Sequence, residues 1–82
     1  MRDSFYITTG MDLDKLNDRI DKYELIERER SYVFISTATA NAAFPYHEWT
    51  QSLRAGDGVK GLYSGCRVFI NNDLHFGEVE LR

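Results

Sequence analysis

The pattern of apolar and charged positions near the start of the chain predicts one amphipathic helix. Four apolar residues recur at helical spacing, and the positions between them are almost all charged or polar. These four residues are Leu13, Leu16, Ile20 and Tyr23. A Thr-x-x-Asp pattern from Thr9 to Asp12 resembles a capping box, so the helix is expected to begin within residues 10–12. Ile26 continues the same spacing, which leaves the end of the helix open as far as Arg30.

Two segments on either side of this helix are typical of β-strands. Residues 4–8 form a short stretch rich in aromatic and β-branched side chains. In residues 31–37 both sides of the predicted strand are apolar, so we expect this strand to be covered on both faces. One side consists of Tyr32 and Phe34, and the other of Val33 and Ile35.

The middle of the chain predicts a loop followed by a second, shorter helix. The small and polar residues 37–43 are typical of a loop. Pro45 suits the first turn of a helix, because its missing N–H would have had no partner there. The apolar stripe of this helix would consist of Tyr46, Trp49 and Leu53. Gly56 is a natural residue for its end.

The last third of the chain predicts a brief strand at residues 59–63, a break at Ser64-Gly65, and then a hairpin within residues 66–81. A turn at residues 71–73 would align aromatic and oppositely charged residues across the two strands. The aligned pairs would be Ile70 with His75, Phe69 with Phe76, and Arg67 with Glu78. One face of this hairpin would carry Arg67, Phe69, Leu74, Phe76, Glu78 and Glu80.

These elements predict a single α+β domain over residues 1–82, with the order β-α-β-α-β-β. We expect two helices and a mixed sheet of four to five strands that ends in an antiparallel hairpin. The sequence leaves open which face of the sheet the helices cover.

Composition and charge narrow the classes of function. The chain has 82 residues, with 10 Lys and Arg against 13 Asp and Glu, and its formal net charge is −3. A net negative charge disfavours a protein that grips duplex DNA, and no direct binding of nucleic acid is expected. Cys66 is the only cysteine and has no partner for an internal disulfide, which indicates a cytoplasmic protein. No apolar run approaches the roughly 20 residues of a membrane span, so no contact with a membrane is expected.

The sequence offers no catalytic constellation, cofactor motif or metal site. Residues 56–61 match G-x-G-x-x-G, but they follow a predicted helix rather than a strand, so they indicate a helix end and a turn. His47-Glu48 has Gln51 where a zinc motif needs a second histidine. In the predicted hairpin Cys66 and His75 lie about 13 Å apart, too far to share an ion. We therefore do not expect an enzyme. A small enzyme or ligand binder built around Tyr46, His47 and Glu48 is the least favoured of the functions considered.

What remains is a surplus of apolar surface. If both helices pack on one side of the sheet, its other side would expose an apolar patch, the usual mark of a protein contact. That patch would comprise Phe69, Leu74 and Phe76 beside Glu78, or else Tyr32 and Phe34. The acidic side of the first helix, with Asp14, Asp18 and Asp21, is a second candidate contact surface.

We therefore expect a non-enzymatic protein-binding module. An inhibitor or adaptor that occludes a partner protein fits these features, by analogy with phage-encoded inhibitors of host nucleic-acid enzymes. The alternative is self-association through the same apolar face, as a homodimer or a homo-oligomeric structural subunit. The sequence leaves open which of the two surfaces makes the contact.

Overall fold

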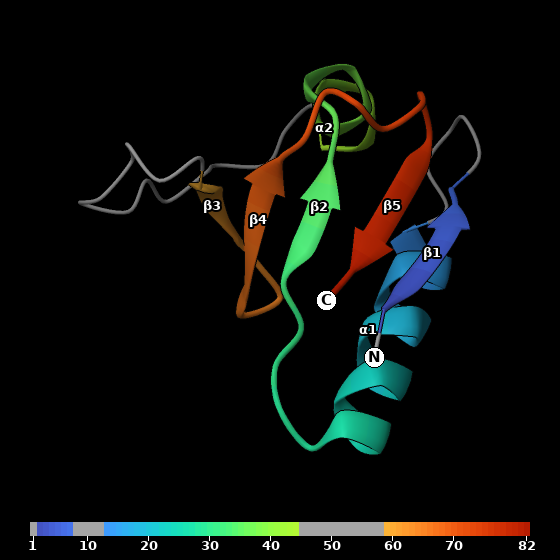
Figure 1. The fold of residues 1–82 in the computed structure, drawn as a ribbon, viewed down its shortest axis with the longest axis vertical. Coiled ribbons are helices and arrows are strands. Elements are labelled where there is room, and N and C mark those ends of the chain that lie inside the picture. Colours follow the sequence, from blue (N-terminus) through green and yellow to red (C-terminus); the bar gives the residue numbers. More distant parts are fainter. Residues whose placement is uncertain (1, 8–12, 45–58) are drawn as a thin grey trace.

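The computed structural model describes residues 2–7, 13–44 and 59–82, and these form an α+β fold (Figure 1). In chain order the elements are β1 (Asp3–Tyr6), α1 (Leu13–Glu27), β2 (Val33–Ile35), α2 (Thr37–Ala43), β3 (Val59–Tyr63), β4 (Cys66–Ile70) and β5 (Glu78–Leu81). The five strands form one mixed sheet in the order β1-β5-β2-β4-β3. The predicted fold class is confirmed, although β1 and β2 are shorter than the sequence indicated. No helix in the described ranges has the length and apolar character needed to cross a membrane.

The predicted hairpin within residues 66–81 is wrong, because β2 lies between its two strands. β2 pairs with β4 in parallel and with β5 in the antiparallel direction, so Ile35 has Ile70 on one side and Val79 on the other. The connection from β4 to β5 passes the end of β2, where the Asn71 N–H donates to the Ile35 carbonyl at 2.8 Å. The pairs Phe69–Phe76 and Arg67–Glu78 therefore do not form.

The hairpin that does form joins β3 to β4 at the break predicted from Ser64-Gly65. Tyr63 pairs with Cys66 across the turn, and both turn residues have positive φ, 51° at Ser64 and 79° at Gly65. Two positive φ values are the mark of a type I′ turn, whose twist matches that of the paired strands. Glycine suits its position because it reaches this conformation without steric cost.

The helix α1 confirms the predicted amphipathic pattern. Leu16, Ile20 and Tyr23 are buried, and Leu13 packs against them from the first turn. The helix ends at Glu27, where Arg28 turns into the left-handed region with a φ of 58° and donates its N–H to the Glu24 carbonyl at 2.8 Å. Arg28 thus adopts the left-handed conformation that a glycine at the end of a helix usually provides.

The helix α2 occupies residues for which the sequence predicts a loop, so that prediction is wrong. Ser36 caps its first turn, because its Oγ accepts the Thr39 N–H at 3.1 Å. Four of the seven residues that come after Ser36 are alanine, the residue with the highest helix propensity. The second helix predicted from Pro45 to Gly56 lies outside the described residues.

One face of the sheet forms the core, and both helices contribute to it. The buried strand residues on this face are Phe5, Val33, Ile35, Cys66, Val68, Val79 and Leu81, and they form one cluster with the buried residues of α1 and α2. Figure 1 shows α1 behind the sheet near β1, and α2 beyond the end of β2. No helix covers the opposite face in the part of the chain that the structure describes. Tyr32 is 47% exposed on that face, so the expectation that residues 31–37 are covered on both sides is wrong at this residue, whereas Phe34 is half-buried.

Candidate functional site

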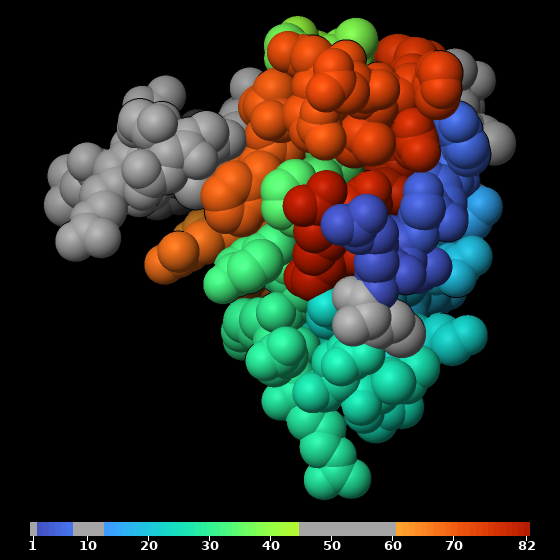
Figure 2. Space-filling model, in the orientation of Figure 1, coloured from blue at the N-terminus to red at the C-terminus, as the bar shows by residue number. Residues whose placement is uncertain are grey.

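The uncovered face of the sheet, which we call the open face, is the strongest candidate site. Because side chains alternate along a strand, each buried core residue is flanked by residues that point to the open face. They are Ser4 and Tyr6 on β1, Phe34 on β2, Leu62 on β3, Arg67 and Phe69 on β4, and Glu78 and Glu80 on β5. Tyr32 and Arg82 extend this alternation just outside β2 and β5, and they exchange two backbone hydrogen bonds at 2.6 and 3.0 Å. Figure 2 views the molecule from this side.

Three rings form an aromatic cluster on the open face: Tyr32 just before β2, Phe34 on β2 and Phe69 on the neighbouring β4. Phe34 and Phe69 stack with centroids 5.1 Å apart and planes 14° from parallel. Tyr32 meets Phe69 edge-on, with the centroids at 5.6 Å and the planes at 83°. On the other side of Phe34 the guanidinium of Arg82 lies 4.4 Å from the ring centroid, a cation–π contact.

Charged residues surround the aromatic cluster unevenly. The carboxylate of Glu80 pairs with Arg82 and, at 3.5 Å, with Arg2. Glu78 accepts hydrogen bonds from the Ser4 hydroxyl at 3.3 Å and from the His75 N–H at 2.9 Å. Arg67 is exposed, and no described residue forms an ion pair with it.

The structure separates the two contact surfaces that the sequence suggested. Phe69 and Glu78 lie on the open face, and the aromatic cluster joins Phe69 to Tyr32 and Phe34. Leu74 and Phe76 lie in the connection 71–77, which Figure 2 shows in orange at one end of the open face. Leu74 is half-buried, whereas Phe76 is 53% exposed.

Asp14, Asp18 and Asp21 are all exposed on α1, whose buried residues pack on the other face of the sheet. The acidic residues of α1 and the open face therefore lie on opposite sides of the sheet and do not form one continuous surface. The contribution of Arg2 and Arg82 to the open face was missed, because both lie at the ends of the chain and meet only through the pairing of β1 with β5.

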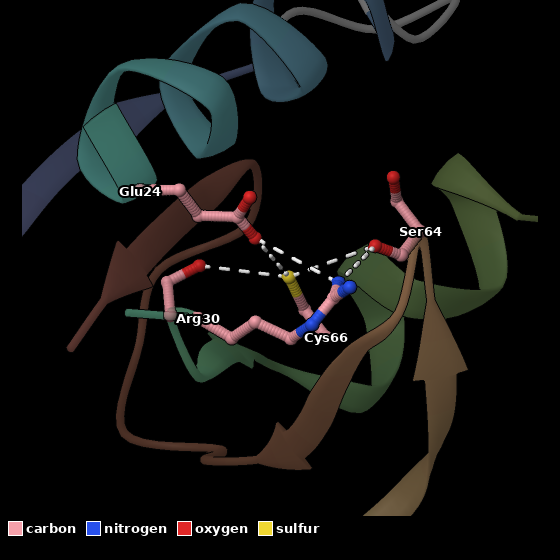
Figure 3. Close-up of polar contacts among 5 residues, drawn as sticks. Glu24, Arg30, Ser64 and Cys66 are labelled. Atoms are coloured by element: carbon pink, nitrogen blue, oxygen red, sulfur yellow. Dashed lines mark hydrogen bonds and ion pairs between the residues drawn. The ribbon is translucent and has the colours of Figure 1, made fainter. Parts of the chain in front are cut away.

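A second cluster of reactive side chains surrounds Cys66 on the core side (Figure 3). The thiol lies 3.6 Å from Glu24 Oε1, to which it donates, and 3.7 Å from the Ser31 hydroxyl. Arg30 reaches the same carboxylate at 3.9 Å and donates to the Ser64 carbonyl at 3.4 Å. These contacts connect the last turn of α1, the entry to β2 and the β3–β4 turn.

The chemistry of the Cys66 cluster favours a structural thiol. Cys66 is fully buried, and burial raises the pKa of its thiol, with the carboxylate of Glu24 raising it further. A nucleophilic cysteine needs the opposite, an accessible thiol with a lowered pKa. No group of three or more His, Cys, Asp or Glu side chains among the described residues could hold a metal ion. Tyr46, His47 and Glu48 lie outside these residues.

We expect Cys66 to resist chemical modification in the folded protein. Labelling with the thiol reagent DTNB at pH 8 should be at least about 100-fold slower in native buffer than in 6 M guanidinium chloride, because only opening of the fold exposes the thiol. The measurement is the release of the coloured thiolate over time. Native labelling at the rate of the unfolded chain would contradict the burial of Cys66.

Two hollows lie on the surface of the described residues. One, of 330 Å³, lies at the end of α1 and is lined by Glu24, Arg28, Glu29 and Arg30. Another, of 230 Å³, is lined by Asp3, Arg19, Lys22, Tyr23 and Ile26. Small-molecule sites usually have mainly apolar walls with a few polar groups. The first hollow is lined by charged residues only, whereas the second combines Tyr23 and Ile26 with three charged side chains.

The open face therefore remains the arrangement with the clearest chemistry: exposed rings, unbalanced positive charge and a sheet without a second helical layer in the described ranges. Comparisons with protein-family models, with curated proteins and with solved structures found no match for this chain.

Proposed function

We propose that this protein is a non-enzymatic binding module that docks a partner protein on its open face, as an inhibitor or adaptor. The observation that carries the proposal is the aromatic cluster, which stands at the centre of the face without a helix over it in the described part of the chain. Protein interfaces are enriched in aromatic residues and arginine, and their binding energy concentrates in such residues near the centre.

The exposed apolar residues support the same surface. Tyr6, Tyr32 and Leu62 belong to the open face, and they are 51%, 47% and 44% exposed. Tyr32 belongs to the aromatic cluster, Tyr6 and Leu62 lie on the edge strands on either side of it, and Phe76 lies in the connection at the end of the face. A typical interface covers about 800 Å² of each partner, so the connection 71–77 would contribute to it together with the strands. The lone cysteine, which has no partner for an internal disulfide, favours a cytoplasmic setting for this activity.

Self-association through the same face is the second candidate function. β2 is the middle strand of five, so a two-fold axis beside it would bring the aromatic cluster of one copy against that of another. Light scattering after size exclusion separates the two functions. A strict monomer at micromolar concentration would remove self-association.

We expect Phe76→Asp to abolish capture of the partner while leaving the fold intact. Phe76 is 53% exposed, so a carboxylate at this position is solvated in the free protein. In an interface the same carboxylate would be buried with no opposite charge beside it, which disfavours binding. The test is quantitative mass spectrometry of proteins captured from the native host by the wild type and the variant, with circular dichroism as the check of folding.

The matched control is Leu25→Asp, which adds the same charge at an apolar residue that is 78% exposed on α1, away from the open face. This variant should keep the partner. An unfolded Phe76→Asp variant would show instead that Phe76 belongs to the core. Equal loss of the partner in both variants would show that the contact does not depend on the open face.

A further inference from the structure

The register of the strands aligns three arginines across one end of the open face. Since Asp3 pairs with Leu81, the preceding Arg2 lies opposite Arg82. Arg82 in turn forms backbone hydrogen bonds with Tyr32. The parallel pairing of Val33 with Val68 places Tyr32 beside Arg67 on the next strand. The arginine row is Arg2, Arg82 and Arg67, with Tyr32 between the last two.

The arginine row carries excess positive charge on a chain that is acidic as a whole. Arg2 and Arg82 share the carboxylate of Glu80, and Arg67 has no ion pair with any described residue. Counted by side chains, three guanidinium groups against one carboxylate leave a charge of +2 in this row, whereas the side chains of the whole chain sum to −3. Arg82 and Arg67 lie two strand spacings apart, about 10 Å, which is close to a Debye length at physiological salt.

The geometry of the aromatic cluster indicates what can lie on it. Phe34 stands between Phe69 and Arg82, which come from the two strands that flank β2. Both faces of its ring are therefore occupied. Platforms for single-stranded nucleic acid need ring faces that are open for bases to stack on. Side chains of a polypeptide make no such demand, because they pack against ring edges as well as ring faces.

Carboxylates match the arginine row in spacing as well as in charge. In the extended polyproline II conformation each residue rises about 3.1 Å and the side chains repeat every three residues, so two carboxylates three residues apart lie on the same side, about 9 Å from each other. That is close to the separation of Arg82 and Arg67 across β2. Arginine binds carboxylates through paired, charge-assisted hydrogen bonds, which add direction to the attraction.

We propose that the occupant of the open face is an acidic, extended polypeptide segment. Its carboxylates pair with the arginine row, and an apolar side chain next to them packs on the aromatic cluster. This inference rests on the proposed protein-binding function and names the chemistry of the partner.

The test is fluorescence anisotropy with three labelled probes. The first is a 12-residue peptide in which glutamates at every third position surround one central tryptophan. The second has lysine in place of each glutamate, and the third is an oligothymidylate of 12 nucleotides. The glutamate peptide should bind at least about tenfold more tightly than either of the others, and its affinity should fall between 50 and 200 mM NaCl.

Variants then locate the site. Arg67→Glu should weaken binding of the glutamate peptide at least about fivefold, and Arg67→Gln, which removes the positive charge without adding a negative one, should weaken it less. Lys22→Glu is the matched control, because it makes the same charge change at an exposed residue of α1 and should leave the affinity unchanged. Circular dichroism of each variant confirms the fold.

Three results would overturn the inference. They are tighter binding of the oligothymidylate, equal affinity for the glutamate and lysine peptides, and equal loss of affinity in Lys22→Glu and Arg67→Glu. If Phe76→Asp still abolishes capture of a partner while the glutamate peptide fails to bind, the inference falls and the proposed function stands. If Phe76→Asp retains the partner, the proposed function itself falls.

Discussion

Replacing Gly77 by alanine is expected to lower the free energy of unfolding by about 2–4 kcal/mol, because strain and a steric clash act together. Gly77 has a φ of +85°, a conformation that alanine reaches only at a cost. A Cβ atom there would lie 2.9 Å from the backbone carbonyl oxygen of Ile7. This neighbour cannot move aside easily, since the Ile7 N–H donates to the Gly77 carbonyl at 2.8 Å and holds the two segments together.

Gly65→Ala is the matched control for that variant. Gly65 has a similar φ of +79°, but its added Cβ would meet the end of the flexible Arg30 side chain, 2.3 Å from Nη1. Arg30 can move away, so the free energy of unfolding should fall only by the cost of holding alanine at a positive φ, about 1–2 kcal/mol. Urea denaturation of both variants measures the difference. Equal losses would show that the clash with the Ile7 carbonyl contributes nothing.

The helix and strand predictions succeeded where a pattern is local. The stripe of Leu16, Ile20 and Tyr23 defines α1 because one side of a helix must pack. The break predicted at Ser64-Gly65 coincides with the turn between β3 and β4, where both residues have positive φ. The helix α2 was missed although it carries a local signal, since Ser36 before an alanine-rich run is typical of a capped helix start.

The failure of the predicted hairpin has a physical cause that sequence spacing alone does not contain. Strands close in sequence usually pair, and the turn-forming residues 71–73 favoured that outcome for β4 and β5. β2 instead lies between β4 and β5, so each residue of β2 has one partner in β4 and another in β5. The assignment of faces survived this error. β4 and β5 remain in one sheet, so Val68 and Val79 still point to the core while Phe69 and Glu80 still point away.

The candidate site was predicted only in part for the same reason. Phe69, Tyr32 and Phe34 were recognised as apolar residues in need of cover, but as two alternative patches rather than one cluster. They become neighbours because β2 and β4 are parallel partners, a pairing between segments that are more than 30 residues apart in the chain. The arginine row depends on the same long-range order, since Arg2 and Arg82 lie at opposite ends of the sequence.

The segment that carries Leu74 and Phe76 is fixed to the rest of the fold by a buried hydroxyl. The Thr39 Oγ1 accepts the Gly77 N–H at 2.9 Å and lies 2.8 Å from the Ser36 hydroxyl. Thr39 is fully buried, so no water replaces it as an acceptor if it is removed. The hydroxyl thereby links the first turn of α2 to the connection 71–77 at the end of the open face.

Thr39→Val should therefore lower the free energy of unfolding by about 2–3 kcal/mol, because it keeps the shape of the side chain and leaves a buried N–H without a partner. Thr39→Ser keeps the hydroxyl and loses one methyl group, so it should cost only about 1 kcal/mol. Urea denaturation gives both values, and hydrogen exchange of the Gly77 amide reports on the contact directly. Exchange should accelerate in Thr39→Val well beyond its change in Thr39→Ser. If Thr39→Val loses no more stability and protection than Thr39→Ser, the hydroxyl contributes no more than the methyl group, and its bond to the Gly77 N–H is not what fixes the connection that carries Phe76.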